Sequence, residues 1–152
     1  MLKKMFSSFL ILVALICFNN VISTAQEISR HDELIVNGNR LIVKKKYNEA
    51  HGAYDEATKL KSDSFIGWYN KGIALDLLGR YEEAIETYNR IIDLRPSSHE
   101  AWNNKGLTLA RIPEKREEAI EAYNSAIQAN PTFDAAWFNM AWGAFPFFCE
   151  FI

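Results

Sequence analysis

Apolar side chains recur every three or four residues through most of the chain, with polar side chains between them. In the segment 84–94 they are Ala84, Ile85, Tyr88, Ile91 and Ile92, and charged and amide side chains gather on the opposite side. This spacing places the apolar residues on one face of an α-helix. The same pattern predicts three pairs of helices, which are 32–44 with 48–59, 65–78 with 81–94, and 99–110 with 115–129.

The helix pairs repeat with a period of 34 residues. The recurring positions are a glycine in the first helix and an alanine and a tyrosine in the second: Gly38, Gly72 and Gly106; Ala50, Ala84 and Ala119; Tyr54, Tyr88 and Tyr123. A fixed period of this length is typical of stacked helix pairs. Glycine costs a helix about 1 kcal/mol relative to alanine, so we expect these glycines to allow close packing within each pair. The third pair has one extra residue, which we place in the loop 111–116.

Further signals mark where the repeats begin and end. Pro96 and Pro131 fall where one repeat stops, and Ser97 followed by Glu100 predicts a capping box for the next helix. Trp102 heads the first helix of its repeat, and we expect it to be buried between adjacent helix pairs.

Together, W-x-x-K-G, A-x-x-x-Y and a closing proline resemble the tetratricopeptide repeat (TPR) family, from Ser29 to Trp137. The resemblance implies an all-α fold, namely a right-handed α-solenoid of about three and a half helix-turn-helix repeats. The expected division of the chain is a signal peptide at 1–25, a linker at 26–30, repeats at 31–64, 65–98 and 99–133, and a partial fourth repeat with an aromatic tail at 134–152.

The first 25 residues have the layout of a secretory signal peptide. Lys3 and Lys4 precede an unbroken apolar run at 9–18, and small residues lead up to Ala25. Cleavage after Ala25 would make the protein an exported one, which is secreted, periplasmic or otherwise extracytoplasmic. An uncleaved membrane anchor is the alternative, although the run is shorter than the roughly 20 apolar residues that cross a bilayer.

The C-terminal residues depart from the repeat. Lysine and glycine follow Asn70 and Asn104, whereas Asn139 is followed by MAWGAFPFFCEFI. Three explanations remain open: a truncated or frame-shifted gene product, a tail that docks on a partner or a membrane, and a tail that folds back over the third repeat. Because the aromatic residues exceed what three repeats can cover, we expect an exposed apolar patch and self-association through 137–152.

The charge of the chain argues against nucleic acid as a partner. Two of its 17 basic residues lie in the leader, which leaves 15 against 19 acidic residues and a net charge of −4. The only basic run in the remaining chain, at 44–46, is predicted to be a solvated turn between two helices.

Catalytic and metal-binding patterns are missing from the sequence. His31, His51 and His99 lack a second ligand at helical spacing, and we expect each to be a partly exposed helix residue. Cys149 is the one cysteine outside the leader, so no intramolecular disulfide is expected. We therefore expect no enzyme, no cofactor and no metal site.

The resemblance to TPR proteins implies that the first helices line a groove for a peptide or protein partner. The candidate groove residues are Asn39, Ile66, Tyr69, Asn70, Ile73, Asp76, Glu100, Asn103, Asn104 and Leu107, with Asp32, Ile35, Val36, Ile42 and Ala110 at the remaining equivalent positions. The alternative for each residue is that it packs in the interior or is merely solvated. The predicted function is a non-enzymatic interaction scaffold, and the alternative is a membrane-associated assembly protein.

One group of TPR proteins clamps the C-terminal carboxylate of a chaperone with lysine, arginine and asparagine side chains. Asn39 and Asn70 match this group, but Ile35, Glu100 and Asn104 occupy the positions of its two lysines and its arginine. Two asparagines without these cations cannot hold a carboxylate. We therefore do not expect a carboxylate clamp.

Overall fold

The structure is a computed structural model that describes the backbone of residues 2–144 and the side chains of 15–17 and 19–142. The described residues are all-α, as predicted, and contain no strand. The helices are α1 (Leu2–Val43), α2 (Tyr47–Leu60), α3 (Phe65–Leu77), α4 (Tyr81–Leu94), α5 (His99–Leu109), η1 (Pro113–Lys115), α6 (Arg116–Ala129) and α7 (Asp134–Ala144). Apart from the start of α1, the ends of the six predicted helices agree with these bounds to within one residue.

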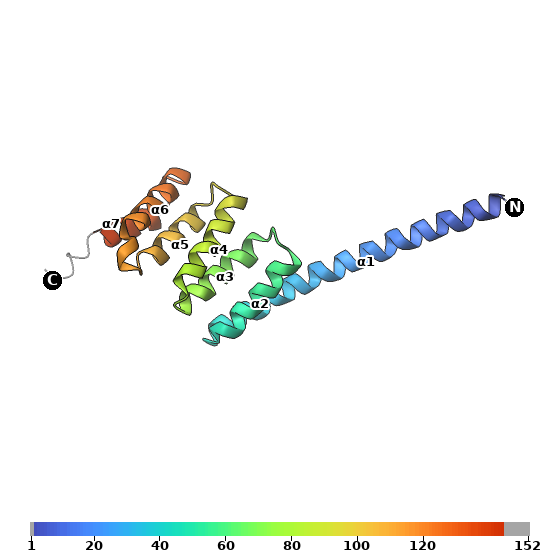
Figure 1. The fold of residues 1–152 in the computed structure, drawn as a ribbon, viewed down its shortest axis with the longest axis horizontal. Coiled ribbons are helices and arrows are strands. Elements are labelled where there is room, and N and C mark those ends of the chain that lie inside the picture. The colour runs from blue at the N-terminus through green and yellow to red at the C-terminus, as the bar shows by residue number, and fades with distance from the viewer. Residues whose placement is uncertain (1, 145–152) are drawn as a thin grey trace.

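The helices pair in chain order and the pairs stand side by side (Figure 1). Helix α1 is 42 residues long, and its N-terminal part projects away from the stack. Residues 26–30, which we expected to form a linker, are helical and belong to α1. The described side chains from Leu15 to Arg30 are exposed, and His31 is the first buried one. The repeat core therefore begins at His31.

In each helix pair, a tyrosine ring of the second helix packs directly against a glycine of the first helix. A Cβ atom added to Gly72 would lie 2.7 Å from the ring of Tyr88, and one added to Gly106 would lie 2.6 Å from the ring of Tyr123. Both distances are too short for a real side chain, and both tyrosines are only 1% exposed. The prediction that the recurring glycines allow close packing is confirmed.

The recurring tryptophans lie at the junctions between repeats. The indole N–H of Trp102 donates to the carbonyl of Pro96 at 2.9 Å, and Trp68 bonds in the same way to Ser62 at 2.8 Å. Trp102 packs against two clusters of buried residues, one that includes Leu109 and Tyr123 and one formed by Ala126, Ile127 and Ala136. It is only partly buried, not buried as expected, because its N–H edge reaches the loop before α5.

Two serines cap the first helices of the second and third repeats. Ser64 accepts a bond from the Gly67 N–H at 3.2 Å, and Ser98 accepts one from Ala101 at 3.3 Å. The cap of α5 is therefore Ser98 and not Ser97, one residue from the predicted position. In the turn before α4, Gly79 has a φ of 73°, which favours glycine.

The short helix η1 lies in the loop where we placed the extra residue of repeat three. Beyond it, α7 packs against α6 with Ala136 buried, while Trp137, Phe138 and Trp142 are 48%, 64% and 63% exposed. The predictions for 145–152, including those on Pro146, Cys149 and the phenylalanines, lie outside the described residues. Within the described part of the chain, no helix combines the length and the apolar character needed to span a membrane.

Candidate functional site

Two hollows lie side by side along the first helices of the repeats. The first hollow, between α1 and α3, has a volume of about 170 Å³. It is lined by Asn39, Ile42, Tyr54, Asn70 and Ile73. The tyrosine that closes the first repeat therefore also forms part of the floor of this hollow.

The second hollow, between α3 and α5, has a volume of about 270 Å³. It is lined by Tyr69, Ile73, Asp76, Leu77, Tyr88, Asn104, Leu107, Thr108 and Arg111. Ile73 borders both hollows, so they adjoin, and we call the two together the groove. The groove is lined by seven of the ten candidate residues: Asn39, Tyr69, Asn70, Ile73, Asp76, Asn104 and Leu107.

The other three candidates are placed differently. Ile66 is exposed on α3 outside the lining of both hollows. The Glu100 carboxylate accepts a bond from Ser98 at 3.2 Å and lies 3.5 Å from His99. Asn103 is only 5% exposed, because its side chain lies between α5 and α7, where it accepts a bond from Asn139 at 2.9 Å.

Of the additional positions in repeat one, Ile35 is buried in the core with Leu34 and Ala50. It packs and does not line the groove. Val36 is 68% exposed on α1, and Ile42 lines the first hollow.

Amide and hydroxyl groups are held in fixed positions on the groove floor. The Tyr54 hydroxyl donates to Asn39 Oδ1 at 2.7 Å, and Asn70 Nδ2 donates to the same oxygen at 3.0 Å. Burial raises the pKa of Tyr54 to about 12, so its hydroxyl remains a donor at neutral pH. Deeper along the groove, Asp76 accepts from Thr108 at 3.1 Å and pairs with Arg111 at 3.4 Å.

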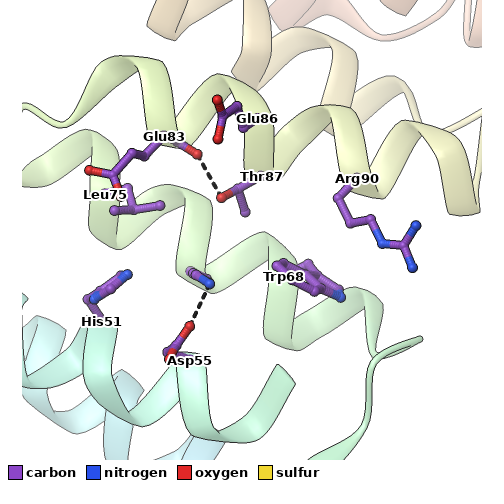
Figure 2. A pocket seen from close by; sticks show the side chains of 9 residues that line it. His51, Asp55, Trp68, Leu75, Glu83, Glu86, Thr87 and Arg90 are labelled. Carbon is purple, nitrogen blue, oxygen red and sulfur yellow. Dashed lines mark hydrogen bonds and ion pairs between the residues drawn. The ribbon is translucent and has the colours of Figure 1, made fainter. Parts of the chain in front are cut away.

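A third hollow of about 380 Å³ lies between α2 and α4, with α3 as its floor; we call it the back hollow (Figure 2). Its lining residues are His51, Asp55, Trp68, Lys71, Leu75, Glu83, Glu86, Thr87 and Arg90. Lys71 Nζ lies 2.6 Å from Asp55 Oδ1 and 4.9 Å from the centre of the Trp68 ring. The side chains of Lys71 and Asp55 are 16% and 28% exposed, so this ion pair is largely shielded from water.

The charges in the back hollow depend on one another. Asp55 also pairs with Lys59 at 2.7 Å, and the bonds from Lys59 and Lys71 lower the pKa of Asp55 to about 2. Burial, followed by the nearby charges of Arg80 and Lys71, lowers the pKa of His51. Glu83 is paired with Arg80. Three charged residues that line this hollow, Asp55, Lys71 and Glu83, are therefore already paired.

The structure changes the interpretation of one histidine. His31, expected to be partly exposed, is 4% exposed, and its Nε2 lies 2.8 Å from Ser64 Oγ. Its Nδ1 lies 2.9 Å from Asp32 Oδ1. The contact between His31 and Ser64 spans 33 residues and joins the first helix of repeat one to the cap of α3. Sequence reasoning missed it because the equivalent position is Phe65 in repeat two. In repeat three it is His99, whose Nε2 lies 3.3 Å from Asn130 Nδ2 and not from a serine.

Asp32, His31 and Ser64 are connected in the order of a serine-hydrolase triad. A nucleophilic serine needs space for a substrate, however, and Ser64 is only 5% exposed, caps α3 and lines none of the three hollows. The arrangement therefore connects two repeats. Among the described residues, no group of three or more His, Cys, Asp or Glu side chains could hold a metal ion.

Comparison with known proteins places these features in context. The family model "Tetratricopeptide repeat" matches residues 36–99 and 88–132. No curated protein matches the chain at a significant level. Among solved structures, the Sgt2 TPR domain from Aspergillus fumigatus is 25% identical with a TM-score of 0.70, over 75% of this chain and 76% of that chain.

Two further solved structures are TPR domains with a partner. The first TPR of Spaghetti (RPAP3), bound to the HSP90 peptide SRMEEVD, is 21% identical with a TM-score of 0.70, over 76% of this chain and 91% of that chain. The TPR2B domain of yeast Sti1, in a complex with pHsp70, is also 21% identical with a TM-score of 0.70, over 76% and 96% of the two chains. At this identity the similarity concerns the fold.

Proposed function

Because the chain belongs to the tetratricopeptide repeat family, we propose that it is a non-enzymatic interaction protein that binds a segment of a partner protein in the groove. The observation that carries this proposal is that the two hollows adjoin at Ile73 and together follow three successive first helices. A site that extends across three first helices suits a chain segment better than a compact small molecule. We also expect the repeats to follow the right-handed sense of the family.

The lining of the groove supports a peptide as the ligand. Amide side chains at Asn70 and Asn104 can bond both N–H and C=O groups of a peptide backbone, and Ile73 and Leu107 offer apolar contact. Two of the similar domains were solved with peptides or protein partners of chaperone origin. A partner held by its C-terminal carboxylate is not expected, because the lysine and arginine positions of the clamp carry Ile35, Glu100 and Asn104.

We further propose that residues 1–25 are a signal peptide and that the protein is exported. Cleavage after Ala25 would remove no buried side chain among the described residues, since the buried part of α1 begins at His31. Mass measurement of the mature protein tests this point: a first residue of Gln26 is expected, and an intact Met1 would contradict it. The alternative of a membrane-associated assembly protein has no comparable support from the similar structures.

Selection from a random peptide library displayed on phage tests the proposed function. The bait is the mature chain, and a bait with Asn70→Ala and Asn104→Ala lacks two amides of the groove. The matched control bait carries Asn89→Ala and Asn124→Ala, two exposed asparagines on the second helices α4 and α6. All three baits are expected to have the same melting temperature to within a few degrees, since these amides are partly or fully exposed.

The proposal predicts that peptides enriched on the unmodified chain bind the control bait equally well and bind the groove variant at least tenfold more weakly. Peptides that bind all three baits equally would contradict it. So would the absence of any enriched peptide.

A further inference from the structure

The segment 26–30 lies between the proposed cleavage point and the repeat core. It is part of α1, whose N-terminal part projects away from the stack (Figure 1), and its side chains are exposed. Among the described residues, the first hydrogen bond or ion pair from α1 to another helix joins Arg30 to Glu56 of α2, at 3.9 Å. Gln26 lies four residues before this contact.

Removal of residues 1–25 would make Gln26 the first residue of the chain and of α1. The first residues of a domain are poorly ordered unless contacts hold them, and the first N–H groups of a helix have no acceptor within it. The core begins at His31. The backbone and the side chain of Gln26 would therefore be free to change conformation without disturbing the core.

A glutamine at the start of a chain carries a nucleophile and an electrophile in one residue. Its α-amine and its side-chain carbonyl carbon Cδ are separated by Cα, Cβ and Cγ, so a bond between them closes a five-membered ring. Because the reaction is intramolecular, the two groups have a high effective concentration. An ordinary α-amine has a pKa of about 7.7–8.0, so part of it is neutral and nucleophilic at neutral pH.

The step balances without a co-reactant. The α-nitrogen attacks Cδ, the bond between them forms, and the bond from Cδ to Nε2 breaks. One proton of the amine passes to the leaving nitrogen, which departs as ammonia. The product is an uncharged five-membered lactam, pyroglutamate, and no group is oxidised or reduced.

The place of Gln26 at the start of a helix favours this product. The N-terminal end of an α-helix carries a partial positive charge, which repels an α-ammonium group there. Ring closure replaces the ammonium by an uncharged amide and leaves the carboxylate of Glu27, whose charge suits the first turn of a helix. Cyclisation therefore removes an unfavourable charge from the start of α1.

Building on the proposed export, on which this inference rests, we propose that Gln26 is a modification site, where the α-amine of the mature chain closes on its own side chain to form pyroglutamate. The modified end has no α-amine, so aminopeptidases that bind this group cannot shorten the chain from it. The segment 26–30, with the pair of Arg30 and Glu56, is thereby retained.

Mass spectrometry of the exported chain tests the proposal. The full chain is expressed in a host with a secretory pathway, purified, incubated at neutral pH and digested with trypsin, which releases residues 26–30 as one peptide. Most of this peptide is expected to be lighter than its free Gln26 form by one ammonia molecule. In Gln26→Ala, the side-chain amide is absent and the same peptide should keep a reactive α-amine.

The chain contains its own matched control. Gln128 is the one other glutamine, and it is exposed on α6, but its nitrogen is part of a peptide bond. Its tryptic peptide should therefore lose no ammonia. A loss of ammonia at Gln128 as large as at Gln26 would show that the change does not depend on a free α-amine, and it would contradict the proposal.

The remaining results separate the inference from the proposed export. A peptide 26–30 of full mass that still reacts with an amine reagent would overturn the inference and leave export intact. A first residue other than Gln26, beyond the leader, would overturn the cleavage point and the inference together. An intact Met1 would overturn the proposed export as well.

Discussion

The back hollow is larger than either hollow of the groove, at about 380 Å³ against about 170 and 270 Å³, yet its chemistry points away from ligand binding. Asp55 and Lys71 link α2 to α3 across its floor, and Glu83 is held by Arg80. In the groove, by contrast, the asparagines use part of their bonding capacity and Leu107 is open to solvent. This difference is the reason for proposing the groove, and not the larger back hollow, as the binding face.

The contrast assigns stability to the back hollow and ligand binding to the groove, and this assignment can be tested. Residues of the back hollow join successive repeats, so their removal should affect stability and leave ligand binding unchanged. Residues that line the groove, such as Asn70, Asn104 and Leu107, should show the reverse. Each substitution below tests whether these two roles are separate.

The largest effect is expected for Asp55→Ala, which leaves the shielded ammonium of Lys71 without its partner. Breaking a buried pair from one side costs 3–5 kcal/mol, and the partial exposure of this pair reduces the expected loss to about 2 kcal/mol. Urea unfolding measures it. Asp93→Ala, at an exposed position on α4, is the control and should change stability by less than about 0.5 kcal/mol.

A loss of binding in Asp55→Ala, measured well below its melting temperature, would show that the back hollow contributes to the ligand site. Lys71→Met removes the charge together with its need for a partner. It should therefore cost less than Asp55→Ala, and an equal or larger cost would contradict the assigned role of the ion pair.

The same ion pair predicts that the free energy of unfolding depends on pH in the acidic range. The pKa of Asp55 is about 2 in the folded chain, against 3.8 as the ordinary value. A lowered pKa means that the stabilisation is complete above the unfolded-state pKa and is lost as the pH falls from about 4 to about 2. The difference in unfolding free energy between the unmodified chain and Asp55→Asn should therefore shrink over this range. If the difference in unfolding free energy stays constant over this range, the lowered pKa of Asp55 is contradicted.

A smaller, stabilising effect is expected from copying the ion pair to the next junction. Asn89 and Lys105 stand 34 residues after Asp55 and Lys71, and burial lowers the pKa of Lys105. Asn89→Asp should supply the missing carboxylate, raise the pKa of Lys105 and add about 0.5–1 kcal/mol. Asn124→Asp is the matched control, because Met140 occupies the lysine position there and no gain is expected.

The part of the molecule that recurs could be predicted from the sequence. The helix pairs and the glycines under the tyrosine rings follow from columns that repeat every 34 or 35 residues. The same columns supply the seven candidates that line the two hollows, and their role in binding stays a prediction. These features depend on local periodicity, and one repeat supports the interpretation of the next.

The features that escaped prediction are not shared by all repeats. Asp55 becomes Asn89 in the next repeat, and His31 becomes Phe65 there, although His99 takes its position in repeat three, so no complete column indicates the contacts with Lys71 and Ser64. The contacts also join residues 16 and 33 positions apart, which only the stacking of the repeats brings together. Asn103 was misplaced for a related reason: its burial depends on α7, whose sequence departs from the repeat.

The central claim is that the groove, and not the larger back hollow, is the binding face. Chemical-shift mapping on the ¹⁵N-labelled mature chain with a library-selected peptide tests it most directly. The account predicts the largest changes at the side-chain amides of Asn70 and Asn104 and at the backbone of Leu107, with His51 and Arg90 unchanged. Changes centred on His51 and Arg90, with the groove unaffected, would contradict it.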